Sequence, residues 1–549
     1  MGPMTTAPPS LDLEPILSAL DPEQRAAATL PDGPAQIIAP AGSGKTTTMV
    51  ARLAVLLGRG VAPERICVVT FNRDAAQDLT ARVARRLGSQ APSAASIEIR
   101  TLHALARQVL LDVGEGRGLL ADRMPLLRAA RRQLMTGEAD DLPAAAHLDT
   151  WLSAWKVDGR PPPTAARPVL DAYGDLLRAR GVIDFDDMVV RAADLLETDA
   201  ALRARWQDRF EHVCVDEFQD VDAAQLRLVR LLAAPQDNLF VVGDDDQTIY
   251  AWRLADVRRI LRFGDDYPAA RRVMLATNYR CPAAVVEASG RLVAVNRERF
   301  SKPIRAPADA VASPSAIAAV DATRRGWSAD MVRLAAAETR AARTLCFLAR
   351  TRSELTPLVL ALVRAGVPHR TASSPIVDSA RVLALVADVR ATEGRDPPFH
   401  LLRRARAGRG WQRGTSSGDL LADEDHDALD AAMGWAAGFS TVDPFLAAFD
   451  EARSRIATLR TPDAPVELAT VHASKGREWE TVVLVGLDAD HLPNRRSVVD
   501  AADPDRAIEE ERRLAYVAVT RATRRLVLAL DPARPSAFLA EMGFRHAPA

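Results

Sequence analysis

The sequence is poor in cysteine, in lysine and in net charge. Its four cysteines stand far apart among 549 residues, with no CxxC pair or Cys/His cluster. This argues against a zinc or iron–sulfur site and fits reduced thiols in a cytoplasmic protein. The net charge of −1 provides no global basic field, although a neutral chain can still carry a local basic groove for nucleic acid. No run approaches the roughly 18 apolar residues of a membrane span, so no membrane partner is expected.

Lysine is the scarcest of the common charged residues. The chain has Lys45, Lys156, Lys302 and Lys475, and nearly all its other basic residues are arginine. The abundance of alanine and arginine indicates a compositional bias. A lysine retained against such a bias is therefore a candidate for a specific role.

Apolar runs of strand length alternate with segments of helical period. Such alternation predicts a parallel α/β sheet. Residues 104–182 and 376–464 are helical in pattern and interrupt it, so the sequence predicts two α/β units, each split by a helical insertion. The strand-like runs lie at 35–40, 65–71, 97–103, 212–218, 239–244, 272–278, 466–472, 481–487 and 524–530, with a strand-and-helix unit at 344–366.

The segment "APAGSGKTT" lies between a predicted strand and a predicted helix, where a phosphate loop belongs. Glycines allow the backbone to wrap phosphate oxygens, a lysine can reach the β- and γ-phosphates of ATP, and a hydroxyl can ligate Mg²⁺. Alanine stands where the strict pattern has its first glycine, and the alternative is a chance glycine-rich turn. The predicted nucleotide-binding residues are Ala39, Pro40, Ala41, Gly42, Ser43, Gly44, Lys45, Thr46 and Thr47, with Thr46 as a metal ligand.

The segment "VCVDEFQD" (213–220) ends an apolar run in two acidic residues. Asp216 is expected to hold Mg²⁺, partly through water, and Glu217 to polarise the water that attacks ATP. Acidic residues at a strand end can also be merely solvated. The phosphate loop upstream favours the catalytic interpretation.

Ten motifs in order resemble the UvrD/Rep/PcrA type of superfamily-one DNA helicase. This resemblance implies two RecA-like P-loop domains with ATP between them. It places the first domain at 1–103 and 183–273 with a helical insertion at 104–182, and the second at 274–375 and 465–549 with an insertion at 376–464. The motifs are "DPEQRAA", "APAGSGKT", "VTFNRDAA", "TLHALA", "IDFDDM", "VDEFQD", "GDDDQTIYAWR", "TNYRCP", "TVHASKGREWE" and "EEERRLAYVAVTRA".

The resemblance also assigns roles around the nucleotide. Gln24 would contact the adenine edge and Tyr279 would stack on the ring. Arg280 and Arg521 would reach the γ-phosphate from the second domain and stabilise transition-state charge when the domains close. Without the family, either arginine would more commonly be a surface ion pair. Glu478 resembles the residue that contacts the ribose.

The eleven residues "GDDDQTIYAWR" (243–253) resemble the motif that joins nucleotide to DNA. Gln247 is expected to sense the γ-phosphate, while Tyr250, Trp252 and Arg253 contact DNA, with Trp252 stacked on a base. Stacking tolerates any base, as a translocating motor requires. The alternative for Trp252 is a core tryptophan. The three aspartates either support the metal and its water shell or cap a turn.

Further contacts to single-stranded DNA are expected from residues scattered over the other motifs. Buried, hydrogen-bonded histidines are the alternative for the two histidines among them, and stacking alone does not distinguish DNA from RNA. These predicted contacts are Phe71, Asn72, His103, His472 and Lys475.

The chain departs from the family in its second insertion, which is shortened: about 190 residues separate Arg280 from Thr470, and "AGRGWQ" (407–412) stands where relatives have a duplex-contacting turn.

The leading hypothesis is an ATP- and Mg²⁺-dependent 3′→5′ helicase or translocase, cytoplasmic, nucleoid-associated and bacterial. It would act on single strands and single-strand/duplex junctions in repair or replication restart, as a monomer or a DNA-induced dimer, with a repair or replication protein as partner. One alternative strips proteins from single strands and unwinds only with a partner. Another, of a different class, is a nucleotide-switched interaction subunit.

Overall fold

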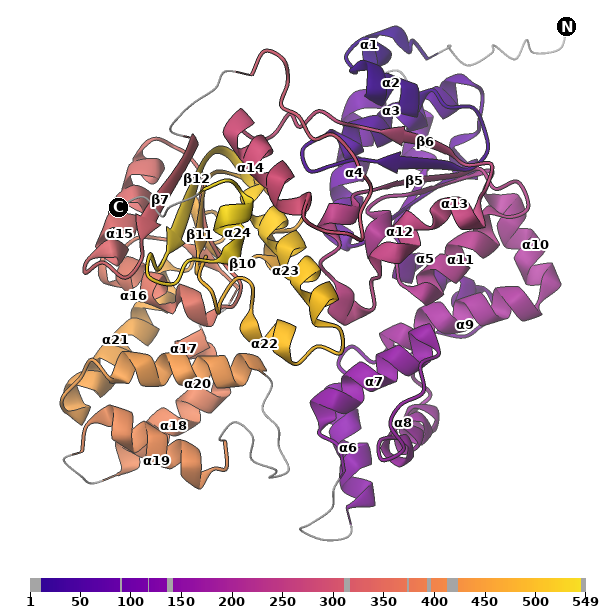
Figure 1. The fold of residues 1–549 in the computed structure, drawn as a ribbon. Coiled ribbons are helices and arrows are strands. Elements are labelled where there is room, and N and C mark those ends of the chain that lie inside the picture. The colour runs from indigo at the N-terminus through magenta and orange to yellow at the C-terminus, as the bar shows by residue number, and fades with distance from the viewer. Residues whose placement is uncertain are drawn as a thin grey trace, which may run out of the picture. The chain divides into compact units, whose positions relative to one another are not determined.

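The computed structural model describes residues 11–88, 91–116, 118–135, 142–310, 316–372, 375–392, 396–411 and 423–544 (Figure 1). The chain forms two compact units. Unit 1 comprises Met1–Tyr279 and Glu298–Ile304, and unit 2 comprises Arg280–Arg297 and Arg305–Ala549. The chain thus enters unit 2, returns to unit 1 for seven residues, and enters unit 2 again.

Unit 1 is built on a sheet of six parallel strands in the order β3-β2-β4-β5-β1-β6. The strands β1, β2, β4 and β5 are buried and mostly apolar, as expected for a parallel sheet covered by helices on both faces. The strand bounds are β1 Ala35–Ile38, β2 Ile66–Thr70, β3 Glu98–Thr101, β4 His212–Val215, β5 Leu239–Gly243 and β6 Arg271–Met274.

The first unit extends past residue 273, where the family resemblance placed the end of the first domain. Two backbone hydrogen bonds keep the extra residues in unit 1. The amide of Leu275 donates to the carbonyl oxygen of Ile38 at 2.9 Å, and the amide of Tyr279 donates to that of Gly42 at 2.9 Å. The segment after β6 therefore stays attached to the phosphate loop.

Separate apolar cores form on the two faces of this sheet, one beneath α3 and α4 and the other beneath α5, α9 and α11. The helices α6, α7 and α8 gather away from the sheet (Figure 1) and enclose a core of their own. Helices of unit 1 are α1 Glu14–Leu17, α2 Pro22–Ala28, α3 Lys45–Gly58, α4 Arg73–Leu87, α5 Leu102–Asp112, α6 Met124–Leu134, α7 Ala145–Asp158, α8 Arg167–Arg180, α9 Phe185–Thr198, α10 Ala200–Arg209, α11 Ala223–Ala233, α12 Val257–Leu261 and α13 Phe263–Asp266.

Lys156 has a structural role in these helices. Its ammonium nitrogen lies 2.8 Å from Asp184 Oδ2 and 2.8 Å from Asp187 Oδ1, and the hydroxyl of Tyr173 donates to the same Asp184 oxygen. Asp184 caps α9 by accepting from the amide of Asp187. One of the four lysines thus anchors a helix start.

Unit 2 has a second sheet of six parallel strands, ordered β7-β12-β11-β8-β10-β9. Its bounds are β7 Ile317–Asp321, β8 Leu345–Ala349, β9 Arg370–Thr371, β10 Val466–Thr470, β11 Trp479–Val485 and β12 Ala522–Leu530. The sequence pattern missed β7 and β9, which lie at the two edges. The first is rich in alanine and only half-buried, and the second has two residues. The α/β fold class with two parallel sheets is confirmed.

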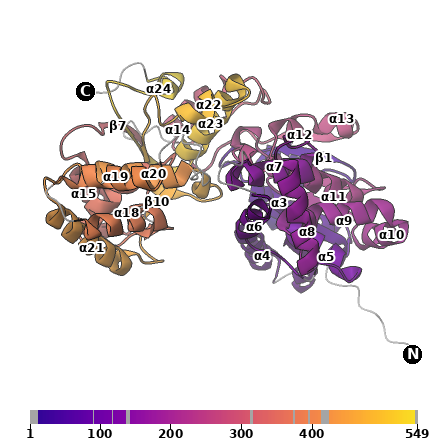
Figure 2. The same cartoon turned by 90° about the horizontal axis from the view of Figure 1, so that it is seen from below.

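The helices α17–α21, which span most of the predicted insertion 376–464, lie together in Figure 1, and α18–α21 are seen from another side in Figure 2. Their core is continuous with that beneath the sheet and includes the rings of Phe445 and Phe449. Residues 412–422, which include the last residue of "AGRGWQ", lie outside the described residues. The helices of unit 2 are α14 Ala283–Val293, α15 Trp327–Arg340, α16 Thr356–Arg364, α17 Pro375–Asp378, α18 Ala380–Ala391, α19 Pro398–Gly408, α20 Asp423–Ala436, α21 Val442–Leu459, α22 Arg495–Val499, α23 Pro504–Val519 and α24 Ala537–Glu541.

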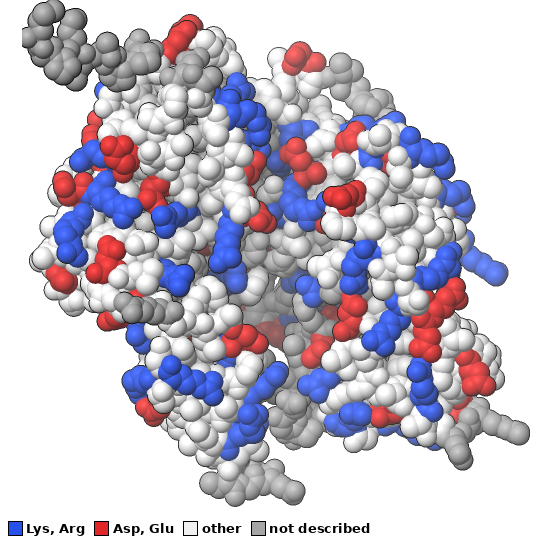
Figure 3. Space-filling view, turned by 180° about the vertical axis from the view of Figure 1, so that it is seen from behind, with Lys and Arg blue, Asp and Glu red and all other residues white. Residues whose placement is uncertain are grey.

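The surface carries charges of both signs. On the face drawn in Figure 3, Lys and Arg side chains are interspersed with Asp and Glu, in keeping with the net charge of −1. No helix within the described ranges combines the length and the apolar character needed to cross a membrane. The four cysteines are buried thiols.

Candidate active site

The phosphate loop connects β1 to α3. Gly42 and Gly44 have φ of +71° and +80°, a conformation that costs other residues free energy. A Cβ on Gly44 would stand 2.5 Å from Gln24 Nε2. No side chain caps the start of α3, and the buried Ser43 hydroxyl has no hydrogen-bond partner among the described residues. Backbone amides at an uncapped helix start and an unsatisfied hydroxyl fit an incoming phosphate.

Two residues predicted to hold adenine pack against this loop. Gln24 Nε2 donates to the carbonyl oxygen of Ser43 at 2.9 Å. Tyr279, whose amide donates to Gly42, is 51% exposed, and its hydroxyl donates to Asp21 Oδ2 at 2.7 Å. Partial burial and the Asp21 carboxylate raise the pKa of Tyr279 to about 12. The hydrogen bonds of the Tyr279 amide and hydroxyl hold this exposed ring beside the phosphate loop.

The two carboxylates predicted to act in catalysis follow β4. The amide of Asp216 donates to the carbonyl oxygen of Val69, and its Oδ1 accepts from the amide of Glu217 at 3.0 Å. Glu217 has φ of +52°, which is uncommon for a residue with a side chain and is found at functional sites. Its Oε1 lies 3.8 Å from the ammonium of Lys45, which donates to the carbonyl oxygen of Ala39. The fold therefore brings the predicted water-orienting carboxylate to the phosphate-loop lysine.

Thr46 lies in the first turn of α3, directly after Lys45, and Asp216 lies at the end of β4. A hydroxyl and a carboxylate are oxygen donors of the kind that Mg²⁺ prefers. These two side chains fit the metal that the family implies.

A chain of hydrogen bonds runs from Glu217 to Gln247. Gln219 Nε2 donates to Glu217 Oε2, and Gln219 Oε1 accepts from the amide of Asp244 at 2.9 Å. Asp244 Oδ2 accepts from Gln247 Nε2 at 2.7 Å. A Cβ on Gly243 would stand 2.6 Å from Gln219 Oε1, so only glycine admits this approach. Sequence reasoning missed Gln219, although it stands two residues after Glu217 in "VDEFQD".

The aromatic residues predicted to bind DNA lie together in unit 1. The rings of Phe71 and Tyr250 stack with centroids 4.9 Å apart, and Trp252 meets Tyr250 edge-on at 6.3 Å. The guanidinium of Arg253 lies 5.1 Å from the Trp252 ring centroid. Trp252 is 64% exposed, so the core alternative for it is wrong. These four residues form what we call the aromatic platform.

The other predicted DNA contacts divide between the units. Asn72 caps α4 by accepting from the amide of Ala75 at 2.8 Å. His103 is half-buried against the edge of the Phe185 ring, and burial lowers its pKa. In unit 2, His472 begins a short 3-10 turn that follows β10, and Lys475 comes directly after that turn.

Unit 2 brings together the three residues predicted to act from the second domain. Arg280 Nε donates to Glu478 Oε2 at 2.6 Å. Arg521 is buried, and its guanidinium donates to the carbonyl oxygens of Val517 and Arg477 at 2.9 and 3.1 Å. Glu478 directly follows Arg477, so the predicted ribose contact and both predicted fingers belong to one cluster.

Comparison with known proteins shows the family of the chain. Residues 20–268 match the UvrD/REP helicase N-terminal domain, and residues 450–531 match the UvrD-like helicase C-terminal domain. The chain belongs to the UvrD/Rep family of helicases, which confirms the resemblance seen in the ordered motifs.

Individual relatives cover most of the chain. It is similar to the ATP-dependent DNA helicase UvrD2 of Mycobacterium tuberculosis, with 30% identity over 94% of this chain and 79% of the relative. It is 26% identical to DNA helicase II of Escherichia coli, over 97% of this chain and 88% of the relative. The ATP-dependent DNA helicase Rep of Escherichia coli is 32% identical over 52% of this chain and 44% of its own length.

Proposed function

We propose that this chain is an ATP-dependent DNA helicase that moves 3′→5′ along single-stranded DNA. The names of its relatives support the activity, and the direction comes from the family resemblance. The observation that carries the proposal is the segment 243–253. This segment contains both Gln247, which a chain of hydrogen bonds joins to Glu217, and the exposed Trp252.

In this mechanism the phosphate loop of unit 1 binds ATP. Lys45 contacts the β- and γ-phosphates and Glu217 orients the attacking water. Thr46 and Asp216 would hold Mg²⁺, which supplies charge neutralisation between the phosphates when bound. Gln247 contacts the γ-phosphate. Its carboxamide is already oriented by Asp244, at 2.7 Å.

The arginines of unit 2 complete the proposed reaction. Arg280 and Arg521 act on the γ-phosphate as fingers, while Glu478 contacts the ribose. An arginine donates several N–H groups in a fixed plane and stabilises the charge that develops on a phosphoryl group. Hydrolysis then depends on groups from both units, which is how a motor couples turnover to movement.

The aromatic platform supplies the proposed grip on DNA. Bases stack on exposed aromatic rings regardless of sequence, and Arg253 adds a positive charge for the backbone. Single strands and single-strand/duplex junctions are the proposed substrates. A cytoplasmic role in repair or replication restart, alongside a repair or replication protein, follows from the family alone.

The test combines two assays on the wild-type chain. We expect single-stranded DNA to stimulate ATP turnover, and we expect strand displacement from a duplex with a 3′ tail but not from one with a 5′ tail. Glu217→Gln serves as the hydrolysis-deficient control, and an RNA strand of the same sequence tests the choice of nucleic acid.

A second candidate is a translocase that unwinds only with a partner. The insertion that contains α17–α21 favours it, because the family resemblance implies a longer insertion in full-length relatives. Stimulated turnover without displacement would select this candidate. Turnover with no response to DNA would instead favour a nucleotide-switched interaction subunit.

A further inference from the structure

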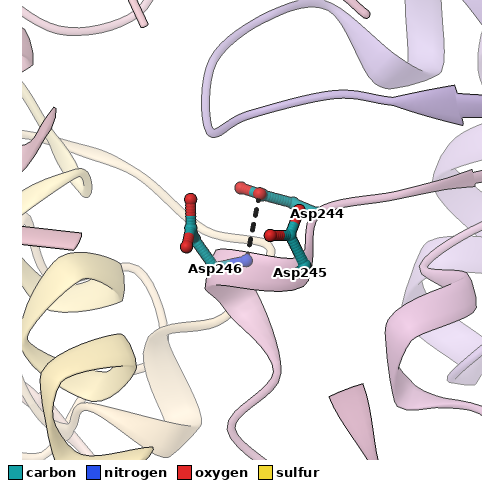
Figure 4. A group of neighbouring side chains, drawn as sticks. All are labelled: Asp244, Asp245 and Asp246. Carbon is teal, nitrogen blue, oxygen red and sulfur yellow. Dashed lines mark hydrogen bonds between the residues drawn. The ribbon is translucent and has the colours of Figure 1, made fainter. Parts of the chain in front are cut away.

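Lys302, which sequence analysis left without a role, is buried among three carboxylates. Its ammonium nitrogen lies 2.8 Å from Asp244 Oδ1 and 2.9 Å from Asp246 Oδ2, and it also contacts Asp245 Oδ1. The lysine side chain is 1% exposed and the three aspartates 0%. The aspartates occupy one tight turn after β5, with the amide of Asp246 donating to Asp244 (Figure 4).

Lys302 reaches this turn on a short segment, 298–304, which we call the strap. The strap belongs to unit 1, although the chain on both sides of it belongs to unit 2. Arg299 pairs with Asp246 through two nitrogens at 3.0 and 2.9 Å, and the amide of Phe300 donates to Asp245 Oδ2 at 2.8 Å. Each aspartate of the turn thus has a partner on the strap.

The three aspartates form the one cluster of potential metal ligands found in the described part of the chain. The Lys302 ammonium lies among them, so the lysine itself is the cation of this cluster. Asp244 also caps the turn, as one of the two sequence interpretations predicted. Only Oδ1 of the Asp244 carboxylate faces the strap, since its Oδ2 accepts from Gln247. The other interpretation, support of the metal and its water shell, stays a prediction.

The pKa values of Asp244 and Asp245 are shifted in opposite directions. Burial alone would raise the pKa of Asp244, but the ammonium groups of Lys302 and Lys45 and two hydrogen bonds hold that pKa below its ordinary value. Burial raises the pKa of Asp245 to about 6 despite Lys302. Lys302 therefore keeps Asp244 ionised, and an ionised carboxylate accepts more strongly from the Gln247 carboxamide.

We propose that Lys302 is a positioning residue for ATP hydrolysis. It holds Asp244 Oδ1, so that Oδ2 of the same carboxylate orients the carboxamide of Gln247. The backbone of Asp244 in turn holds Gln219, which donates to Glu217. One buried ammonium thereby orients both the predicted γ-phosphate sensor and the predicted water-orienting carboxylate. This inference rests on the proposed function for the roles of those two residues.

The test compares steady-state ATP turnover among variants of the full chain. Lys302→Met removes the charge and leaves three buried carboxylates, so it is also made with Asp245→Asn, which removes one of them. Lys302→Arg keeps the charge. The matched control is Arg299→Gln, which removes another ion pair, with Asp246, from the same strap without a contact to Asp244.

We expect the kcat of the double variant to fall by about 10- to 100-fold, since a small misplacement of reacting groups costs that much. Its affinity for a non-hydrolysable ATP analogue should stay within about twofold, because the phosphate loop is intact. Lys302→Arg should recover most of the kcat, and Arg299→Gln should stay within about twofold of wild type.

Two results would overturn the inference. One is a folded double variant with the kcat of wild type. The other is an equal loss of kcat in Arg299→Gln, which would mean that the strap only stabilises the fold. A wild-type chain that hydrolyses ATP without any response to DNA would contradict the motor proposal instead, since Lys302 is judged by the ratio of variant to wild-type turnover.

Discussion

Replacing Trp252 with alanine should weaken the binding of single-stranded DNA while leaving ATP binding intact. The side chain is 64% exposed, and its ring contacts within the protein are the edge of Tyr250 and the guanidinium of Arg253. A base stacked on an aromatic ring contributes roughly 1–3 kcal/mol, so the dissociation constant should rise about 5- to 140-fold. Because the ring is mostly exposed, unfolding free energy should change by no more than about 1 kcal/mol.

The assay is fluorescence anisotropy of a labelled oligothymidine at one fixed salt concentration, since phosphate contacts make the affinity depend on salt. The same variants are titrated with DNA in the ATPase assay. Trp252→Phe is the matched control, because it keeps an aromatic face and should retain most of the affinity. A dissociation constant for Trp252→Ala within twofold of wild type would refute the stacking role.

The remaining predictions concern hydrolysis, the phosphate loop and pH. Lys45→Ala and Glu217→Gln should each lower turnover at least about 100-fold, while Glu217→Gln still binds a fluorescent ATP analogue. Gly44→Ala should destabilise the fold by about 1–2 kcal/mol or more and weaken ATP binding, because φ is +80° and the new Cβ would stand 2.5 Å from Gln24 Nε2. Thermal unfolding measures the loss of stability, and nucleotide titration measures the loss of ATP affinity. Burial raises the pKa of Glu354 from 4.5 to about 7. The unfolded chain therefore ionises this carboxyl at a lower pH than the folded chain does, and the free energy of unfolding should fall as pH rises between those values. Glu354→Gln should remove the part of the fall in Tm between pH 5 and 8 that comes from this carboxyl.

Each of these has a contradicting result. Near-normal turnover in Glu217→Gln would assign the attacking water to another group. A Gly44→Ala chain with unchanged Tm and ATP affinity would mean that the loop relaxes without cost. If Tm falls equally with pH in wild type and in Glu354→Gln, the Glu354 carboxyl is not the source of that fall.

Much of the site could be predicted because its signals are local. A phosphate loop requires glycines, a lysine and a hydroxyl within a few residues, and the strand–loop–helix context comes from hydropathy over the same window. The structure places the predicted Gln24, Lys45, Glu217 and Tyr279 around that loop. The order of the motifs then identified the family, which the comparisons confirm.

Weak local signals explain what was missed in the fold. The strands β7 and β9 lie at sheet edges, where a strand needs few apolar residues, and β9 has only two residues. The end of unit 1 at Tyr279 depends on hydrogen bonds to Ile38 and Gly42, far away in the sequence. No pattern within 270–280 encodes those partners.

The sequence by itself determined the α/β class, the family and the candidate residues of the nucleotide site, because each follows from spacing or order along the chain. Only the tertiary structure decided that Trp252 is exposed, that Gln219 joins Glu217 to Asp244, and that Lys302 is the partner of the three aspartates. Lys302 stands more than fifty residues after Asp244, and a buried ion pair over that separation exists only because the strap returns to unit 1.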